Sequence, residues 1–331
     1  MSFSIETKRL ILKPIALSEL DELYALRSDA DVMRYIGKLQ TKEEVRDFIK
    51  LGQDYFDKYR LDFFSVFEKQ TGEFVGQAGL FHLAFDIKQP DIELAYRIHK
   101  KFWGQGYTTE AAKALIKYGF EQLSLPKIIA MHHPDNMASK RVIEKAGLQY
   151  TKMIDYRGIE LPCYEIYNDK IKLGLLKDHQ NLIPEIAKWS IKEFGYLNPG
   201  ETVDDAINKL NMHLNTDTLP ICFVLLNDKK LIATAALRKT SVDTYQSVSP
   251  WLGGVMVDEQ CRGKGIGSLL MGLVMAEAKK IHKGPWYLIT SVRENFYTNL
   301  GWEKIDETVY NDVPGVIMQL APCSCYELIR G

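Results

Sequence analysis

The chain has 331 residues, of which 46% are hydrophobic and 26% charged, and its formal net charge at pH 7 is -1. Two globular domains are expected, since a single hydrophobic core rarely grows beyond about 250–300 residues. The near-neutral charge gives no general attraction to nucleic acid or to an anionic membrane, and no uncharged stretch reaches membrane-spanning length. No signal peptide is evident, and five cysteines without a repeated spacing predict reduced thiols in a cytoplasmic protein.

The first half of the chain alternates between strand-like and helix-like segments. Residues 8–15 read as a strand that Pro14 ends, and residues 17–26 carry helical periodicity with Ser18 as the expected N-cap. Thr41 and Glu44 predict a capping box for a second helix over 41–59. The other elements expected here are a hairpin over 63–68 and 73–83, a strand over 92–98, a helix from a glycine turn to about 122, a strand over 127–131, a helix over 136–145 that Gly147 ends, and paired strands over 148–156 and 163–168.

The second half repeats this order of elements. It is expected to hold a strand over 171–176, helices over 183–194 and 202–214, a hairpin over 222–226 and 231–237, a strand over 251–257, a helix from a second glycine turn to about 281, a strand over 286–290, a short helix over 295–300, and strands over 302–310 and 316–320. The offset is steady, since Gly263 lies 159 positions after Gly104 and Gly301 lies 154 after Gly147. The repetition predicts two duplicated domains, residues 1–168 and 169–331.

Each half contains a glycine turn between a strand and a helix, which is a candidate phosphate site. The turns read Gln260-Cys261-Arg262-Gly263-Lys264-Gly265-Ile266-Gly267-Ser268 and Lys101-Phe102-Trp103-Gly104-Gln105-Gly106-Tyr107-Thr108. Alternate glycines leave backbone N–H groups unobstructed at a helix N-terminus, where the macrodipole favours an anion. A single motif of this kind can be only a tight turn, but two copies in matched contexts favour the phosphate site.

Two other phosphate-binding motifs fit the second turn less well. A Rossmann fingerprint needs a third glycine where Ser268 stands, and an acidic residue about 20 positions later at the end of a second strand, where this chain has a helix. A P-loop needs Ser or Thr after its lysine, and Lys264 is followed by Gly265. A nucleotide-binding module of either kind is therefore not expected.

With this order of elements, the residues resemble the GNAT superfamily of acyl-CoA N-acyltransferases in two tandem copies. The superfamily's pyrophosphate turn reads Arg/Gln-x-x-Gly-x-Gly/Ala; the second copy matches it from Gln260 to Gly265, and the first copy has Lys101 at the Arg/Gln position. The segments 7–12, 103–111 and 136–148 resemble the branch that acetylates N-terminal α-amines of ribosomal proteins and various small amines. The stretch from Phe296 to Trp302 matches the superfamily's late motif, so the resemblance covers nearly the whole chain.

The resemblance implies an α/β fold for each copy, with a mixed, mostly antiparallel central sheet flanked by helices. Two central strands are expected to splay apart and admit the pantetheine arm of acetyl-CoA, the implied cosubstrate. The implied cofactor-binding residues are Ile98, Lys101, Gly104, Gly106, Thr108 and Asn136 in the first copy, and Val255, Val257, Arg262, Gly263, Lys264, Gly265, Gly267 and Ser268 in the second. The implied activity is direct transfer of acetyl to a primary amine, either a peptide α-amine or a small-molecule amine. Alternatively, one copy is catalytic and the other is a non-catalytic acyl-CoA sensor or a structural domain.

Acyl transfer from a thioester needs an acid for the departing thiolate, and the resemblance implies one candidate in each copy. Tyr297 occupies the superfamily's position for an acid that protonates the sulfur; packing beside Trp302 is the alternative interpretation. Ser139 occupies the position near the thiolate in the related branch, with Asn136 on the pantetheine arm. A helix N-cap would explain Asn136 equally well.

The amine must also lose a proton, and Glu93 is the candidate base of the first copy. It alternates with Ile92 and Leu94 on the strand before the glycine turn, so it points either into the acceptor cleft or to solvent. Residues 251–256 contain no acidic side chain, which leaves the base of the second copy unassigned. His132 and His133 have no further ligands at usable spacing, so no metal is expected.

Overall fold

The computed structural model describes residues 3–156, 158–241, 245 and 248–321, and Cys323 and Cys325 lie outside these ranges. The chain divides into two compact units, Met1–Asn168 and Asp169–Gly331. Three cysteines inside the described ranges, Cys163, Cys222 and Cys261, are buried free thiols. Among the helices described, none combines the length and the apolar character needed to cross a membrane.

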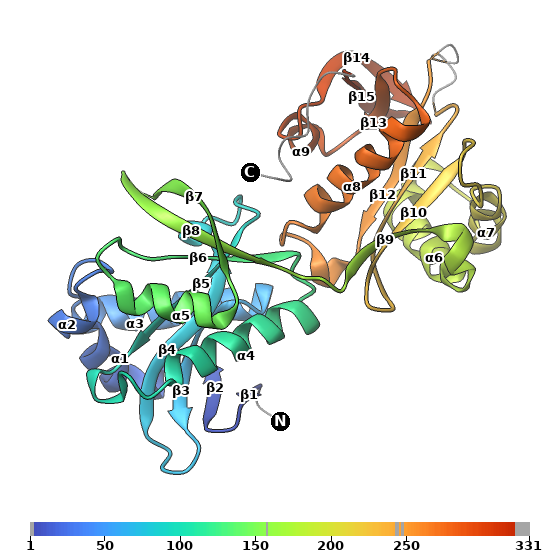
Figure 1. The fold of residues 1–331 in the computed structure, drawn as a ribbon. Helices are drawn as coiled ribbons and strands as arrows, with labels where there is room; N and C mark the ends of the chain where they lie inside the picture. The colour runs from blue at the N-terminus through green and yellow to red at the C-terminus, as the bar shows by residue number, and fades with distance from the viewer. Residues whose placement is uncertain (1–2, 157, 242–244, 246–247, 322–331) are drawn as a thin grey trace. The chain divides into compact units, whose positions relative to one another are not determined.

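An eight-stranded sheet forms the centre of the first unit, with the order β1-β2-β3-β4-β5-β6-β8-β7 (Figure 1). Its strands are β1 (Ile5–Glu6), β2 (Leu10–Pro14), β3 (Asp62–Glu68), β4 (Phe74–His82), β5 (Ile92–Ile98), β6 (Lys127–Met131), β7 (Gln149–Tyr156) and β8 (Ile159–Tyr167). Only the β5–β6 pair is parallel, and the other described pairs are antiparallel. The expected mixed, mostly antiparallel sheet is confirmed.

Helices cover both faces of this sheet. On one face, α1 (Leu20–Arg27) and α3 (Lys42–Tyr59) pack through Leu26 and Ile49 against Phe63 and Phe81, and the four-residue α2 (Ala30–Met33) lies between these helices in the chain. The opposite face carries α4 (Tyr107–Glu121) and α5 (Met137–Ala146), which share a core with the alternate strand residues. The central strand β4 is thus buried along its whole length, whereas β7 at the edge is mostly exposed.

Helix ends show where local sequence rules held and where one failed. Thr41 accepts the Glu44 N–H at 3.2 Å and Glu44 accepts the Thr41 N–H at 2.8 Å, so the predicted capping box is confirmed. The N-cap expected at Ser18 is wrong, because a 3-10 turn over Leu17–Glu19 begins after Ala16. The Glu19 carboxylate accepts the Ala16 N–H at 2.7 Å, which satisfies this helix end without a hydroxyl at the N-cap.

A seven-stranded sheet in the order β14-β15-β13-β12-β11-β10-β9 forms the second unit. Its strands are β9 (Ile171–Leu175), β10 (Ile221–Asn227), β11 (Lys230–Arg238), β12 (Trp251–Val257), β13 (Trp286–Thr290), β14 (Glu303–Tyr310) and β15 (Val313–Leu320), and its helices are α6 (Ile183–Phe194), α7 (Val203–Asn211), α8 (Ile266–Ile281) and α9 (Glu294–Thr298). Starting from β9, the strands follow the same order as β2 to β7 of the first unit (Figure 1). The two halves therefore share one topology.

Asp62, at the start of β3, is a buried carboxyl of the first unit. It is 1% exposed, and a Cβ added to Gly52 on α3 would collide with its Oδ2 atom. Burial raises the pKa of Asp62 to about 7, and the Phe63 N–H and the Arg27 charge offset only part of this effect. Between its unfolded pKa of about 4 and this value, the unfolded chain is ionised while the folded protein stays protonated at this position.

Folding stability should therefore fall as pH rises from about 4 to 7, by up to about 1.4 kcal/mol per pH unit from this group. Asp62→Asn keeps the shape of the side chain and cannot ionise. We therefore expect the difference in urea midpoint, variant minus wild type, to be larger at pH 8 than at pH 5. Urea denaturation of both proteins at the two pH values measures this. An unchanged difference between the two proteins would contradict the buried-carboxyl explanation.

Candidate active site

The central parallel strands of each unit part soon after they meet. In the first unit, β5 pairs with β6 only at Glu93 and Ile129. In the second, β12 pairs with β13 only at Trp251 and Leu252. The later residues of β5 and β12 pair with an antiparallel neighbour on one side, leaving an open backbone edge on the other. The expected splay is present in both units, and Ile98, Val255 and Val257 lie on its open edges.

A glycine turn follows each open edge. Gly104 and Gly106 have φ of 75° and 81°, and Gly263 and Gly265 have φ of 72° and 81°, values that favour glycine. A Cβ at Gly104 or Gly263 would meet nothing within 4 Å, so the space in front of both turns is open. Gly106 and Gly265 are the N-caps of α4 and α8, whose first N–H groups have no acceptor within the helix. These turns fit a phosphate group.

The lysines and the arginine of the turns contact protein groups. Lys101 forms an ion pair with Glu73, and the 5% exposed Lys264 donates to the Gln260 carbonyl at 2.6 Å. Arg262 forms an ion pair with Glu193 on α6 at 2.5 Å. The backbone N–H groups at the starts of α4 and α8, with the Thr108 and Ser268 hydroxyls in the first helical turns, are the remaining donors of the two turns.

The residue before each turn's first glycine holds the end of the preceding strand. Trp103 donates its indole N–H to the Ile98 carbonyl at 2.7 Å, and Arg262 donates its Nε–H to the Val257 carbonyl at 3.0 Å. Both contacts fix the carbonyl of the last strand residue. The sequence analysis missed this pairing, because Trp and Arg share no side-chain signature apart from an N–H donor.

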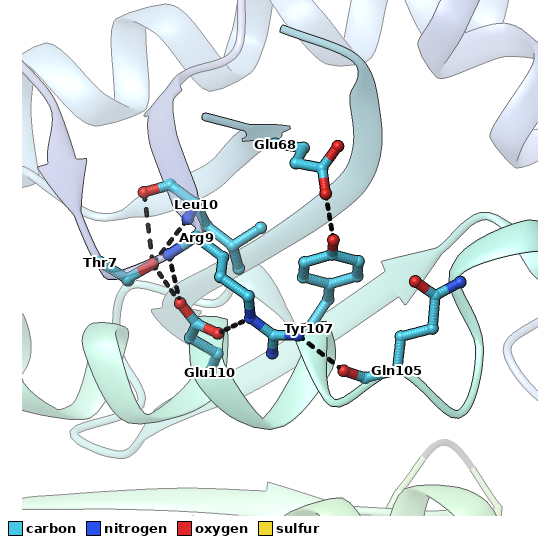
Figure 2. Close-up of polar contacts among 7 residues, drawn as sticks. All are labelled: Thr7, Arg9, Leu10, Glu68, Gln105, Tyr107 and Glu110. Atoms are coloured by element: carbon cyan, nitrogen blue, oxygen red, sulfur yellow. Dashed lines mark hydrogen bonds and ion pairs between the residues drawn. The ribbon is translucent and has the colours of Figure 1, made fainter. Parts of the chain in front are cut away.

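A second missed feature is the network that ties β2 to the glycine turn of the first unit (Figure 2). Glu110, in the first turn of α4, accepts hydrogen bonds from the Thr7 hydroxyl at 2.6 Å, the Arg9 N–H at 2.8 Å and the Arg9 Nε–H at 2.6 Å. Arg9 also donates to the Gln105 carbonyl at 3.0 Å and lies over the Tyr107 ring. Burial acts to raise the pKa of Glu110, but these bonds outweigh it and lower the pKa. The network anchors the glycine turn through the Gln105 carbonyl and α4, and it leaves the space next to Gly104 open.

Removing the Glu110 carboxylate should loosen this turn. Glu110→Ala leaves three donors without their acceptor, so we expect a loss of about 1.5–3 kcal/mol in the free energy of unfolding, measured by urea denaturation. Glu43→Ala, which removes an exposed ion pair with Arg46 on α3, is the matched control and should change stability by less than about 0.5 kcal/mol. Equal effects of the two substitutions would contradict the anchoring role.

Two hydroxyl groups meet between β5 and α5 in the first unit. Tyr96, on the open edge of β5, lies with its hydroxyl 2.9 Å from Ser139 Oγ. Asn136 is the N-cap of α5 and accepts the Ser139 N–H at 3.1 Å, so the helix start positions Ser139. Burial raises the pKa of Tyr96 to about 12, which keeps this hydroxyl protonated at neutral pH. The sequence predicts that Tyr96 begins the splayed strand edge, but nothing in the local pattern links its hydroxyl to a helix 43 residues away.

Glu93 lies on the other face of β5, the face that α1 and α3 cover. Arg97 shares this face because it is four residues further along the strand. Burial lowers the pKa of Arg97 to about 10, and the Glu93 charge acts in the opposite direction. The sequence left open whether Glu93 points into the acceptor cleft or to solvent. In the structure it lies on an inner face of the sheet and is partly buried.

In the second unit, Tyr297 lies on α9 and is 8% exposed. Its ring contacts those of Phe296 and Trp302, with centroids 5.0 and 6.1 Å away. Phe296 in turn approaches Gly267, where an added Cβ would lie 3.2 Å from the ring. Gly267 therefore lets α9 pack against the start of α8, and this contact brings Tyr297 beside the helix that follows the glycine turn.

Comparisons with known proteins agree with this geometry. Residues 9–149 and residues 219–304 each match the model of an acetyltransferase (GNAT) domain. YkkB of Bacillus subtilis is 35% identical over 140 residues, 42% of this chain and 81% of that protein. The uncharacterized N-acetyltransferase YoaA of the same organism is 31% identical over 148 residues, 44% of this chain and 82% of that protein. A crystal structure of a GNAT-family acetyltransferase from Bacillus anthracis is 27% identical, with a TM-score of 0.44, and covers 50% of this chain and 99% of its own.

The chain therefore belongs to the GNAT family of acetyltransferases and carries two such domains in tandem.

Proposed function

We propose that this protein is an acetyl-CoA-dependent N-acetyltransferase that transfers acetyl directly to a primary amine, either a peptide α-amine or a small-molecule amine. In this proposal residues 1–168 and 169–331 are each an acetyltransferase domain, and both bind acetyl-CoA. The observation that carries it is the repeated pairing of an open strand edge with a clear glycine turn. The buried free thiols agree with work in the reducing cytoplasm.

The cosubstrate supplies acetyl as a thioester, and the chain supplies the proton transfers. In the first unit, Glu93 accepts a proton from the attacking amine, because it lies where β5 leaves β6. Ser139 Oγ donates a proton to the departing sulfur and takes one from the Tyr96 hydroxyl 2.9 Å away, and solvent then returns a proton to Tyr96. These groups lie on opposite faces of β5, which keeps the base and the acid apart.

In the second unit the same role as proton donor falls to Tyr297.

One observation favours a second candidate function for this unit, an acyl-CoA sensor or structural domain. Residues 251–257 of β12 contain no acidic side chain, where β5 of the first unit has Glu93. The binding elements of the unit are compatible with both functions, so binding and turnover must be measured separately.

Calorimetric titration of acetyl-CoA into the intact protein tests the binding part of the proposal. We expect two sites, of which Gly104→Trp removes one and Gly263→Trp the other, because each indole fills the open space before its turn. Gly72→Trp and Gly200→Trp are matched controls, since both glycines have positive φ and nothing within 4 Å of an added Cβ. The controls should keep both sites. A folded protein that binds no acetyl-CoA would overturn the proposal.

Turnover of the second unit tests Tyr297. In a Gly104→Trp background, Tyr297→Phe should lower kcat for acetyl transfer by about 10–100-fold, because only the proton donor is lost. Acetyl-CoA affinity should stay unchanged, since the ring and its packing remain. An unchanged kcat would remove Tyr297 from the mechanism, and absent turnover with intact binding would favour the sensor function.

A further inference from the structure

A buried group of cationic and amide side chains lies on the Glu93 face of the first unit. Gln77 on β4 and Arg97 on β5 are directly opposite each other, so they share one face of the sheet. Arg27, at the end of α1, donates its Nε–H to Gln77 Oε1 at 2.9 Å and another N–H to Gln40 at 2.8 Å. Arg27 is 2% exposed and Gln77 is fully buried. Three chain segments thus converge on one polar cluster.

Several buried polar atoms of this cluster lack a hydrogen-bond partner, as do both carboxyl oxygens of the neighbouring Asp62 within the described residues. Within the described residues, four of its buried nitrogens have no hydrogen-bond partner: Arg27 Nη2, Gln77 Nε2, Arg97 Nε and Arg97 Nη1. A buried donor left unpaired costs about 1–3 kcal/mol, and more when it is charged. These four nitrogens are therefore available to an additional acceptor that can take several N–H bonds at once.

The charges of the cluster favour an anion as that acceptor. The carboxyl groups that act on the two guanidinium groups are Asp62, near Arg27, and Glu93, near Arg97. Burial raises the pKa of Asp62 to about 7, so this group is only partly ionised at neutral pH. Positive charge then exceeds negative charge among these groups. A carboxylate accepts up to about four hydrogen bonds and matches the planar guanidinium, whereas water brings no charge.

The position of Arg97 connects this cluster to the reaction. It stands four residues from Glu93 on the same face of β5, and the charges of Glu93 and of Tyr156 on β7 both act on it. An acceptor whose amine lies at Glu93 can therefore extend along β5 toward Arg97. The Cα atoms of Glu93 and Arg97 are about 13 Å apart at the usual rise of a strand. The gap between the carboxylate and the guanidinium is shorter when the two side chains lean toward each other.

We propose that the acceptor of the first unit is an amine that also carries a carboxylate, and that Arg97, backed by Arg27 and Gln77, binds this carboxylate. This inference rests on the proposed function, because the proposed function assigns Glu93 as the base that receives the amine. It narrows the acceptor from any primary amine to an amino acid-like or acidic amine.

Matched pairs of small amines test this inference in the intact protein. The probes are glycine, β-alanine, 4-aminobutyrate and 6-aminohexanoate, each beside its amide, which has nearly the same shape without the charge. Calorimetric binding and acetylation are measured for each probe, with Gly263→Trp present to silence the second unit. We expect at least one acid to bind and react about tenfold or more better than its amide, chiefly through KM.

Arg97→Gln should abolish the preference by raising the Kd and KM of the acid about tenfold or more, with little effect on the amide. Lys100→Gln is the matched control, because Lys100 lies three residues after Arg97 and is an exposed cation that pairs with Asp31. This variant should keep the preference for the acid. Since Arg97 Nε and Nη1 are buried without a hydrogen-bond partner within the described residues, Arg97→Gln should not lower the urea midpoint.

Separate outcomes distinguish this inference from the proposed function. Acids and amides that bind and react equally well, or a preference that survives Arg97→Gln, would overturn the inference and leave the acetyltransferase function standing. Binding of an acid that depends on Arg97, without acetyl transfer, would support the carboxylate site and count against the function. Failure of every acid in the series to bind would overturn the inference, whatever acetyl-CoA binding shows.

Discussion

The early parting of two parallel strands is the constraint on which each unit depends. A strand that loses its neighbour leaves N–H and C=O groups exposed, a cost that proteins normally avoid by pairing or covering the edge. Here β5 keeps a continuous antiparallel ladder with β4, and β12 pairs with β11 through a ladder that a bulge interrupts at residues 254–255, while the other edge of each strand opens. Trp103 and Arg262 bind the last strand carbonyls, and the glycine turns follow at once. The open edge is thus positioned by the neighbouring antiparallel strand, by the side chain that binds its last carbonyl and by the glycine turn that follows.

The fold could be predicted from sequence because its signals are local or periodic. The bounds predicted for β5, β6, β12, β13 and α6 agree with the structure, since apolar runs and turn residues mark each end. The short α2 and the cap at Ala16 were missed, because four residues give no periodicity and a distant carboxylate can replace a capping hydroxyl. Motifs located the turns and Ser139, whereas Tyr96, Arg9 with Glu110, and Arg97 needed the tertiary structure, which joins residues up to 103 positions apart.

The two units share a scaffold and differ in the charges placed on the face opposite the glycine-turn helix. The first unit has Glu93 and Arg97 on β5. The second has no acid on β12, and Arg238 on β11 instead lies against Gly253 and Gly254, where added Cβ atoms would be 3.3 and 3.4 Å from its guanidinium. Its Nε is buried without a hydrogen-bond partner within the described residues. The same open strand edge and glycine turn therefore adjoin different charged groups in the two units.

Buried guanidinium groups whose N–H donors lack a partner are costly in folding, and both units contain one. A buried charge without a partner lowers stability, whereas an apolar side chain of similar size would pack without penalty. Arg97 and Arg238 nonetheless stand near the ends of β5 and β11, on the face that the glycine-turn helix leaves free. Structural need alone does not account for a cation there, because neither forms an ion pair within the described residues. In the proposal made above, an acceptor carboxylate at Arg97 would remove this penalty on binding, which would couple acceptor recognition to the stability of the first sheet.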